Sequence, residues 1–447
     1  METLKVHFVT FGCKVNIYET GVLRSLFEEN CYTAVDSPDD AHVIVINSCT
    51  VTQTADRKLR RTAVSLKNRF PDKVLCITGC YPQAHEEIPF PADVVTGNKD
   101  RGRLISAVNA YMQNRERVSD VSPHCRGDSF EGALINGERD HTRAFMKIQD
   151  GCDMHCTYCI IPAARGHVRS SSIEDIRAQA QLFAANGCKE IVLVGIDLAF
   201  YGLKEGLRLS DAVHAVCETE GIERVRLGSL EPEMISPSDL DALAMEQKLC
   251  PSFHLSLQSG SDKVLKAMGR RYDTALFARL TEELRARFHG CGITADMMAG
   301  FPGESEEDHR TSLQFAKEMG FSHIHVFPYS ERPGTPAAAM PQLLPEIRQS
   351  RAAELQSLSD RLERHFLESH TGKVMPVLFE REHEDGIHHG YTPTYAHVKL
   401  LTKYSTDNAQ KSLRNQIFYV RIEGVEKNSL LGSAEDGYPE NDPCSLL

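Results

Sequence analysis

The chain has 447 residues, of which 41% are apolar and 25% are charged, and its formal net charge is −12 at pH 7. This length is too great for one ordinary hydrophobic core, so we expect two or three globular domains. We find no apolar run of membrane-spanning length and no secretory leader, which predicts a cytoplasmic protein without a membrane partner. A nucleic-acid partner is disfavoured by the negative charge, because such proteins usually carry a basic surface.

Three short β-branched runs near the amino terminus cover residues 5–12, 42–48 and 73–79, and each precedes a segment of helical composition. This alternation predicts an α/β domain with a doubly wound parallel sheet over residues 1–115. A segment over residues 116–140 reads as a linker.

A cysteine follows each of these three strands: Cys13 in "FGCKVN", Cys49 in "NSCTV" and Cys80 in "TGCYPQ". The loops at the carboxyl ends of parallel strands gather at one edge of the sheet, where ligands bind. A single free cysteine is more often a small buried apolar residue. Three at equivalent strand ends favour one shared site, and cytosolic cysteines serve as metal ligands more often than as disulfides.

The segment "ADRKLRRTAVSLKNRF" between the second and third strands is expected to be a helix with Arg57, Arg60 and Arg61 on one face. Such a face can bind phosphate groups, although a solvated helix surface is its more frequent use.

Six strand-like runs recur in the middle of the chain, separated by helix-like segments. The runs are "AFMKIQ", "EIVLVGI", "RVRLGSL", "SFHLSLQ", "ITADMMAGF" and "HIHVFPYS". They predict a partial (β/α)6 barrel over residues 141–370, including a final helix, with its active site at the carboxyl ends of the strands.

The stretch "DGCDMHCTYCIIP" follows the first of these strands and carries Cys152, Cys156 and Cys159. Three closely spaced thiolates can hold zinc or an iron–sulfur cluster. Structural zinc needs a closed set of four ligands, and His155 and His167 do not have the spacing of a second ligand pair. Three thiolates on a cubane cluster leave its fourth iron open for a substrate or cofactor.

"CDMHCTYC", with Tyr158 before its last cysteine, resembles the signature of the radical S-adenosylmethionine (SAM) enzymes. The resemblance implies a 4Fe-4S cluster on Cys152, Cys156 and Cys159 whose open iron binds SAM, and reductive cleavage of SAM to a 5'-deoxyadenosyl radical.

The order of "GCDMHCTYCIIPAARG", "HLSLQSGSDKVLKAMGRRY", "DMMAGFPGE" and "YSERPGT" resembles the methylthiotransferase family across nearly the whole chain. The resemblance implies that Cys13, Cys49 and Cys80 hold a second 4Fe-4S cluster carrying an exchangeable sulfur. One SAM then methylates that sulfur, and a second supplies the radical. Ala163 departs from the family, which often has tyrosine at that position.

Several polar strand-end residues are candidates to hold SAM. We expect Gly195 of "VGID" near its amino group, Glu231 and Gln258 near its ribose and Tyr158 near its adenine, and Asp296 is a further candidate. Each could equally be an ordinary hydrogen-bonding residue at a strand end.

The carboxyl-terminal runs "KVMPVLFE", "YAHVKLLT" and "IFYVRIEGV" predict a small all-β domain over residues 371–430 that resembles the RNA-binding TRAM module. Its aromatic residues, Tyr391, Tyr395, Phe418 and Tyr419, could stack on unpaired bases or pack in the core. Residues 431–447, with Cys444, have the composition of a disordered tail.

Within the family, Lys14 and Val15 of "FGCKVN" resemble the branch that adds methylthio at C2 of N6-threonylcarbamoyladenosine at tRNA position 37, beside the anticodon. The resemblance implies the tRNA anticodon stem-loop as substrate and an electron donor such as flavodoxin or ferredoxin. Other branches act on isopentenyladenosine in tRNA or on an aspartate of a ribosomal protein. A structural zinc protein that binds RNA, and a radical enzyme without sulfur transfer, remain as alternatives.

Overall fold

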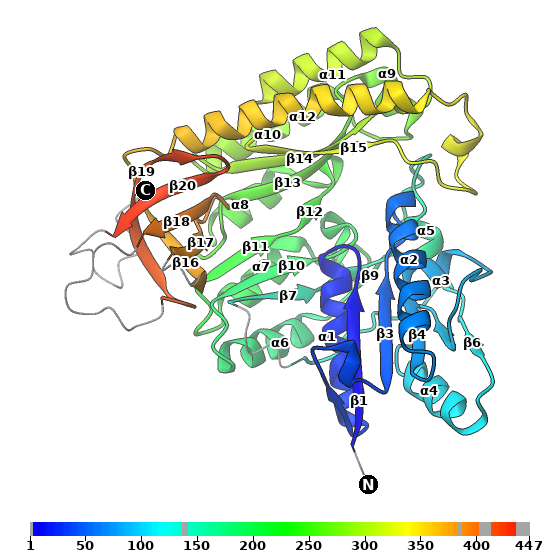
Figure 1. Ribbon diagram of the computed structural model, residues 1–447. Coiled ribbons are helices and arrows are strands. Elements are labelled where there is room, and N and C mark those ends of the chain that lie inside the picture. The colour runs from blue at the N-terminus through cyan, green and yellow to red at the C-terminus, as the bar shows by residue number, and fades with distance from the viewer. Residues whose placement is uncertain (1–2, 136–141, 383–386, 402–412, 435–447) are drawn as a thin grey trace.

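The computed structural model describes residues 3–135, 142–382, 387–401 and 413–434 (Figure 1). Along the chain it forms a parallel sheet flanked by helices, a partial β/α barrel and a small closed β-barrel. This order confirms the predicted fold class.

The amino-terminal sheet has six parallel strands in the order β2-β1-β3-β4-β5-β6. The strands are β1 (Leu4–Thr10), β2 (Tyr32–Ala34), β3 (Val43–Ser48), β4 (Val74–Gly79), β5 (Val94–Thr96) and β6 (Val118–Asp120). The sequence analysis missed β2, β5 and β6, because three residues are too few for a periodic pattern. The last of them lies inside residues 116–140, the segment that reads as a linker.

Helices cover both faces of this sheet. They are α1 (Lys14–Glu29), α2 (Gln53–Arg69), α3 (Cys80–Ala84) and α4 (Arg103–Asn114). Phe27 of α1 and Leu104 of α4 pack on one face, whereas Leu59 of α2 and Tyr81 of α3 pack on the other. The sheet is therefore doubly wound, as predicted.

The central domain contains the six predicted strand regions as parallel strands in two sheets, β11-β10-β7 and β12-β13-β14-β15. Their bounds are β7 (Arg143–Lys147), β10 (Glu190–Val194), β11 (Arg224–Leu227), β12 (Ser229–Leu230), β13 (Ser252–Gln258), β14 (Gly292–Ala299) and β15 (His323–Pro328). One chain segment joins the two sheets, because only Gly228 separates β11 from β12.

Helices form the outer layer of this partial barrel (Figure 1). They are α6 (Ile173–Ala185), α7 (Leu209–Cys217), α8 (Pro237–Ala244), α9 (Asp262–Ala267), α10 (Thr274–Arg287), α11 (Glu306–Met319) and α12 (Pro345–Glu368). The described residues contain no helix that is long and apolar enough to cross a membrane.

The carboxyl-terminal barrel closes in the order β16-β17-β18-β20-β19. Its strands are β16 (Val374–Glu382), β17 (Ile387–Tyr391), β18 (His397–Leu401), β19 (Ile417–Glu426) and β20 (Ser429–Ala434). The sequence analysis missed β17 and β20, and residues 431–434 are not part of a tail, because β20 pairs with both β18 and β19. The rest of the expected tail, with Cys444, lies outside the described residues.

This small barrel is anchored to the central domain through its aromatic residues. Tyr391 and Tyr395 stack with ring centroids 5.0 Å apart, and the guanidinium groups of Arg143 and Arg226 lie 4.6 Å and 4.4 Å from Tyr391 and Tyr395, respectively. Phe418 packs against the core of the small barrel. Tyr391, Tyr395 and Phe418, which we considered for base stacking, are therefore engaged within the protein.

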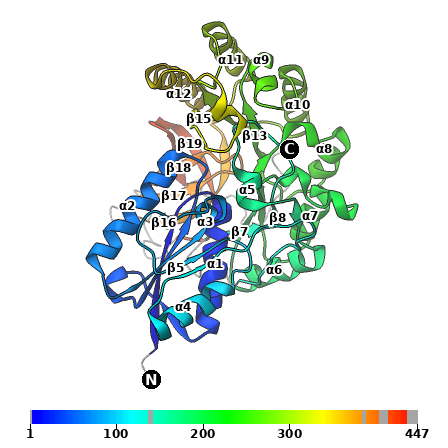
Figure 2. The same ribbon diagram turned by 90° about the vertical axis from the view of Figure 1, so that its right-hand side faces the viewer.

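The amino-terminal domain covers the open side of the partial barrel. Val15, in the first turn of α1, packs against Val192 and Val194 on the inner face of β10. On the same side, α3 lies beside α5 (Ile161–Arg165), as Figure 2 shows. The two predicted cysteine sites are thus brought to one interface.

Gly79 provides a test of how the carboxyl ends of β3 and β4 pack together in the amino-terminal sheet. An added Cβ would lie 2.5 Å from the carbonyl oxygen of Ser48, and the residue has a φ of 97°. Gly290 is a matched control, because its φ is also positive at 67° but its surroundings are open. We expect Gly290→Ala to cost about 1–2 kcal/mol of unfolding free energy through backbone strain alone. Gly79→Ala should cost clearly more, and equal losses in urea unfolding followed by circular dichroism would contradict this packing.

Candidate active site

Three cysteines lie at the carboxyl edge of the amino-terminal sheet. Cys13 precedes α1, Cys49 follows β3, and Cys80 begins α3 directly after β4. Their turns are in close contact, since a Cβ on Gly12 would lie 2.8 Å from the Cβ of Cys49. The predicted convergence of the three strand ends therefore occurs in the structure.

Two asparagines hold these turns together. The Oδ1 atom of Asn16 accepts hydrogen bonds from the backbone N–H and the thiol of Cys13, both at 3.3 Å, and its Nδ2 donates to the carbonyl of Ser48 at 3.2 Å. Asn47 donates in turn to the carbonyl of Asn16 at 2.9 Å. Sequence reasoning did not assign a role to either residue, although both stand within three residues of a cysteine.

Cys49 and Cys80 of this group are buried beside charged side chains, whereas Cys13 is exposed. Burial raises the pKa of Cys80 to about 12, although the neighbouring Arg165 guanidinium opposes that shift. Arg165 donates to the sulfur of Cys80 from Nε at 3.2 Å and from Nη2 at 3.1 Å. Burial likewise raises the pKa of Cys49, and the charge of Cys13 adds to the effect.

The second group, Cys152, Cys156 and Cys159, lies on the loop that leads to α5. The backbone N–H of Cys152 donates to Gly166 at 3.0 Å, and that of Cys159 donates to Cys156 at 3.0 Å. Burial raises the pKa of Cys159 to about 11, and the charge of Cys156 contributes. The three thiols thus lie within electrostatic reach of one another at the predicted end of the barrel. Among the described residues, no three Cys, His, Asp or Glu side chains converge closely enough to hold a single metal ion, so the spacing here is wider than a one-metal site requires.

Two acidic side chains beside this loop lack a partner. Both carboxylate oxygens of Asp197 and of Glu233 are buried, without a hydrogen bond of good geometry among the described residues. Burial raises the pKa of Asp197 well above its usual range, and the charges of Glu231 and Glu233 raise it further. A cation bound beside these carboxyl groups would stabilise their ionised form, and SAM offers an ammonium and a sulfonium group, so these residues fit that cofactor.

A third buried group connects two of the predicted cofactor residues. Arg270 donates to Glu231 at 2.7 Å and to the hydroxyl of Tyr158 at 2.7 Å. This arrangement keeps the Tyr158 side chain beside the cysteine loop and compensates one of the local carboxylates. Arg270 was missed from the sequence because only the folded chain brings it to Tyr158, 112 positions away.

The remaining predicted cofactor residues lie at different depths of the barrel. Gly195 follows β10 and leaves no room for a side chain, since a Cβ would lie 2.7 Å from Oε1 of Gln149. Gln258 ends β13 with a φ of 65°, a left-handed conformation that often marks functional sites. Asp296 lies on β14, where its carboxylate forms an ion pair with His254 at 3.2 Å.

Sequence reasoning chose Gly195 for the amino group of SAM, but Asp197, two positions later, carries the unpaired charge. The sequence could have pointed to Asp197, because this residue ends the "VGID" stretch that follows a predicted strand. Glu233 had no comparable signal, because an acidic residue after a strand is common and its burial depends on the fold.

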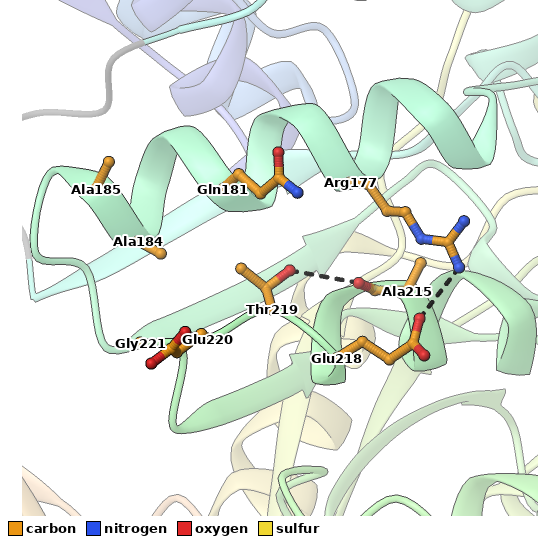
Figure 3. Close-up of a pocket in the computed structure, with 9 residues that line it drawn as sticks. All are labelled: Arg177, Gln181, Ala184, Ala185, Ala215, Glu218, Thr219, Glu220 and Gly221. Carbon is orange, nitrogen blue, oxygen red and sulfur yellow. Dashed lines mark hydrogen bonds and ion pairs between the residues drawn. The ribbon is translucent and has the colours of Figure 1, made fainter.

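Two surface hollows lie on the central domain, one beside the cysteine loop and one remote from it. One, of about 280 Å³, is lined by Ala163, Cys152, His155 and His167 among others, and it occupies the place where the smaller Ala163 departs from the family pattern. The other, of about 540 Å³, lies between α6 and α7 (Figure 3). Its lining includes Gly221, just before β11, so it opens at the amino ends of the strands, away from the cysteines.

Comparisons with known proteins agree with this arrangement. Residues 146–316 match the model of the Radical SAM superfamily, and residues 5–95 match that of the Uncharacterized protein family UPF0004. The chain is 37% identical to the threonylcarbamoyladenosine tRNA methylthiotransferase MtaB of Bacillus subtilis, over 92% of this chain and 93% of that relative. It is 33% identical to the tRNA-2-methylthio-N(6)-dimethylallyladenosine synthase of Symbiobacterium thermophilum, over 94% and 92%.

The chain belongs to the radical SAM methylthiotransferase family.

Membership of this family implies a 4Fe-4S cluster and SAM as cofactors. Among solved structures, the radical SAM methyltransferase TsrM from Kitasatospora setae aligns with a TM-score of 0.55 at 15% identity, over 75% of this chain and 74% of that chain. This similarity extends to the fold alone.

The unpaired carboxylate of Asp197 leads to a prediction about stability and binding. A folded-state pKa above the unfolded value makes this group a stability cost that grows as pH rises beyond the ordinary carboxyl range. Asp197→Asn should therefore raise the melting temperature of the cofactor-free protein at pH 8, and less so at pH 5. The same variant, once reconstituted, should bind SAM about tenfold more weakly or worse.

Asp153→Asn is the matched control, because Asp153 lies on the cysteine loop near Asp197 but is paired with His167 at 2.7 Å. Its pKa is lowered, since the His167 and Lys204 side chains outweigh the effect of burial. Removing that charge should not stabilise the protein. Stabilisation by both substitutions, or by neither, would contradict the distinction between a paired and an unpaired carboxylate.

Proposed function

We propose that this protein adds a methylthio group at C2 of N6-threonylcarbamoyladenosine beside the tRNA anticodon. The observation that carries the chemistry is the meeting of two three-cysteine groups at one domain interface, with Arg165 reaching from the loop of one to Cys80 of the other. When bound, two 4Fe-4S clusters and SAM supply the radical, the methyl group and the transferable sulfur.

The residues of the chain have separate tasks in this reaction. Cys152, Cys156 and Cys159 hold the cluster that binds SAM, and Cys13, Cys49 and Cys80 hold the auxiliary cluster that carries sulfur. Asp197 and Glu233 bind the cationic part of SAM, and Arg270 fixes the side chains of Tyr158 and Glu231 beside it. Enclosure by the amino-terminal domain excludes water, which protects the radical from side reactions.

Lys14 supports the choice of nucleoside. It begins α1, whose next residue, Val15, packs on the inner face of the barrel. Its half-buried ammonium group lies within electrostatic reach of Asp296 and Arg226, next to the ligand Cys13. A threonylcarbamoyl group ends in a carboxylate, which complements an ammonium group in a partly desolvated site, whereas a dimethylallyl group has no charge to pair.

A basic helix face supports the tRNA partner. Arg57, Arg60 and Arg61 of α2 are exposed, and α2 begins beside the end of β15, where the N–H of Gln53 donates to Ser330 at 3.0 Å. A local basic face can contact phosphates despite a net charge of −12, because that charge is distributed over the whole surface.

Dimethylallyladenosine in tRNA is the second candidate substrate, since a relative named for that modification is 33% identical to this chain. An aspartate of a ribosomal protein is a third. A flavodoxin or ferredoxin is the proposed electron donor.

The nucleoside composition of tRNA tests the proposal. Cells that lack the protein should lose 2-methylthio-N6-threonylcarbamoyladenosine by mass spectrometry and retain the unmodified precursor. The wild-type gene should restore the product, and a Cys80→Ala gene should not, because the auxiliary cluster would lose a ligand. Persistence of the product in the deletion strain, with loss of 2-methylthio-dimethylallyladenosine instead, would identify the second candidate as the substrate.

Lys14→Met tests the substrate contact separately. We expect the Michaelis constant for tRNA carrying threonylcarbamoyladenosine to rise about tenfold, while SAM cleavage without tRNA is unchanged. Lys317→Met is the control, because Lys317 is exposed on α11 in the outer layer of the barrel, away from the basic face of α2. Equal effects of the two substitutions would argue against a carboxylate contact at Lys14.

A further inference from the structure

Arg165 connects the two halves of the candidate active site. It is the last residue of α5, on the loop that carries the radical SAM cysteines, and its side chain crosses the domain interface to Cys80. The side chain is 1% exposed, and two of its nitrogens, Nε and Nη2, donate to one sulfur atom. A buried guanidinium directed at a thiol in this way constitutes a specific contact.

Glu19 fixes the guanidinium from the opposite side. Its Oε2 accepts from Nη2 of Arg165 at 3.0 Å, and its Oε1 accepts from Nη1 at 2.5 Å. Glu19 is 1% exposed; burial alone would raise its pKa, but Arg101 and Arg165 lower it to about 2. The carboxylate therefore stays ionised and sets the plane in which Arg165 faces the sulfur.

The charges around this pair do not balance among the residues that the structure describes. There, Arg101, Lys147, Arg165 and Arg169 surround two buried carboxylates, those of Glu19 and Asp150. A further carboxylate, Glu131, reaches Arg101 from the more exposed rim, with 33% of its side chain accessible. Surplus buried positive charge is costly unless an anion lies nearby. Thiolates on an iron–sulfur cluster would supply that anion at Cys80.

The same turn also holds the first cysteine of the other group. The carbonyl of Gly166 accepts the hydrogen bond from the N–H of Cys152 at 3.0 Å, so adjacent residues contact both sites. The amino-terminal domain also holds this turn in place, because the side chain of Asn98 donates a hydrogen bond to the carbonyl of Ala164 at 2.8 Å. The position of the guanidinium is therefore fixed relative to both cysteine groups.

We infer that Arg165 is a positioning residue for the auxiliary cluster, whose Cys80 sulfur it hydrogen-bonds and whose reduced form it stabilises. Hydrogen bonds to cluster sulfurs and nearby positive charge raise the reduction potential of iron–sulfur clusters. The inference rests on the auxiliary cluster of the proposed function and goes beyond it by assigning the residue that sets the redox potential of that cluster.

The test uses the full chain with Cys152, Cys156 and Cys159 all changed to Ala, so that the auxiliary cluster alone contributes to the spectra. In this background, Arg165→Gln should shift the midpoint potential to a lower value in a titration monitored by electron paramagnetic resonance. Arg165→Lys, which keeps the charge but has no planar pair of donors, should give a smaller shift.

Arg101→Gln is the matched control. It removes a buried cation from the same network, but Arg101 contacts Glu19 and Glu131 and makes no described contact with Cys80. Its shift should be smaller than that of Arg165→Gln. An unchanged potential in Arg165→Gln, or one shifted no more than in Arg101→Gln, would overturn the assignment.

A second measurement needs no substitution at Arg165. Arginine labelled with a nuclear-spin-active nitrogen isotope should produce a hyperfine coupling to the reduced auxiliary cluster in pulsed resonance spectra. A cluster present without this coupling would refute the role of Arg165 and leave the proposed function intact. A triple-alanine protein that binds no iron at all would contradict the auxiliary cluster itself, and the inference with it.

Discussion

The position of Glu19 in a buried ion network is the constraint on which the candidate active site depends. Its carboxylate comes from α1 of the amino-terminal domain, whereas Arg165 and Lys147 come from the central domain. Breaking a buried pair leaves an uncompensated charge, so the two domains cannot slide past each other without a large energetic cost. This interface fixes the distance and orientation between the two cysteine groups.

The partial barrel needs such neighbours because its own strands do not enclose a site. Val15 and the first turn of α1 cover one side of the inner face, and the small carboxyl-terminal barrel covers another through Arg224, whose guanidinium donates to the carbonyls of Tyr391 and Pro376 at 2.9 Å each. The amino-terminal domain and the small β-barrel therefore complete the enclosure of the inner face of the partial barrel. The cofactors of a radical reaction need this enclosure, because water and stray donors would quench the reactive species.

Charge is distributed unequally between the surface and this interior. The chain as a whole has a net charge of −12, yet in the described part of the domain interface buried cations outnumber buried carboxylates. Near the SAM cysteines the imbalance is reversed, with Asp197 and Glu233 lacking partners. One half of the site thus suits an anion and the other suits a cation, as the proposed sulfur-bearing cluster and SAM require.

The sequence by itself determined the elements and the ligand types: the long strands, the six candidate cysteines, the family and the "VGID" turn can all be recognised from local patterns. It did not reveal the three-residue strands or the contacts of Arg143 with Tyr391 and of Arg226 with Tyr395, because short elements lack periodicity and contacts across domains leave no local signal. Only the tertiary structure decided that Arg165 faces Cys80 and that Asp197 is unpaired. The physical reason is that the energy of a charged side chain depends on which distant groups are buried with it, and folding alone brings those groups together.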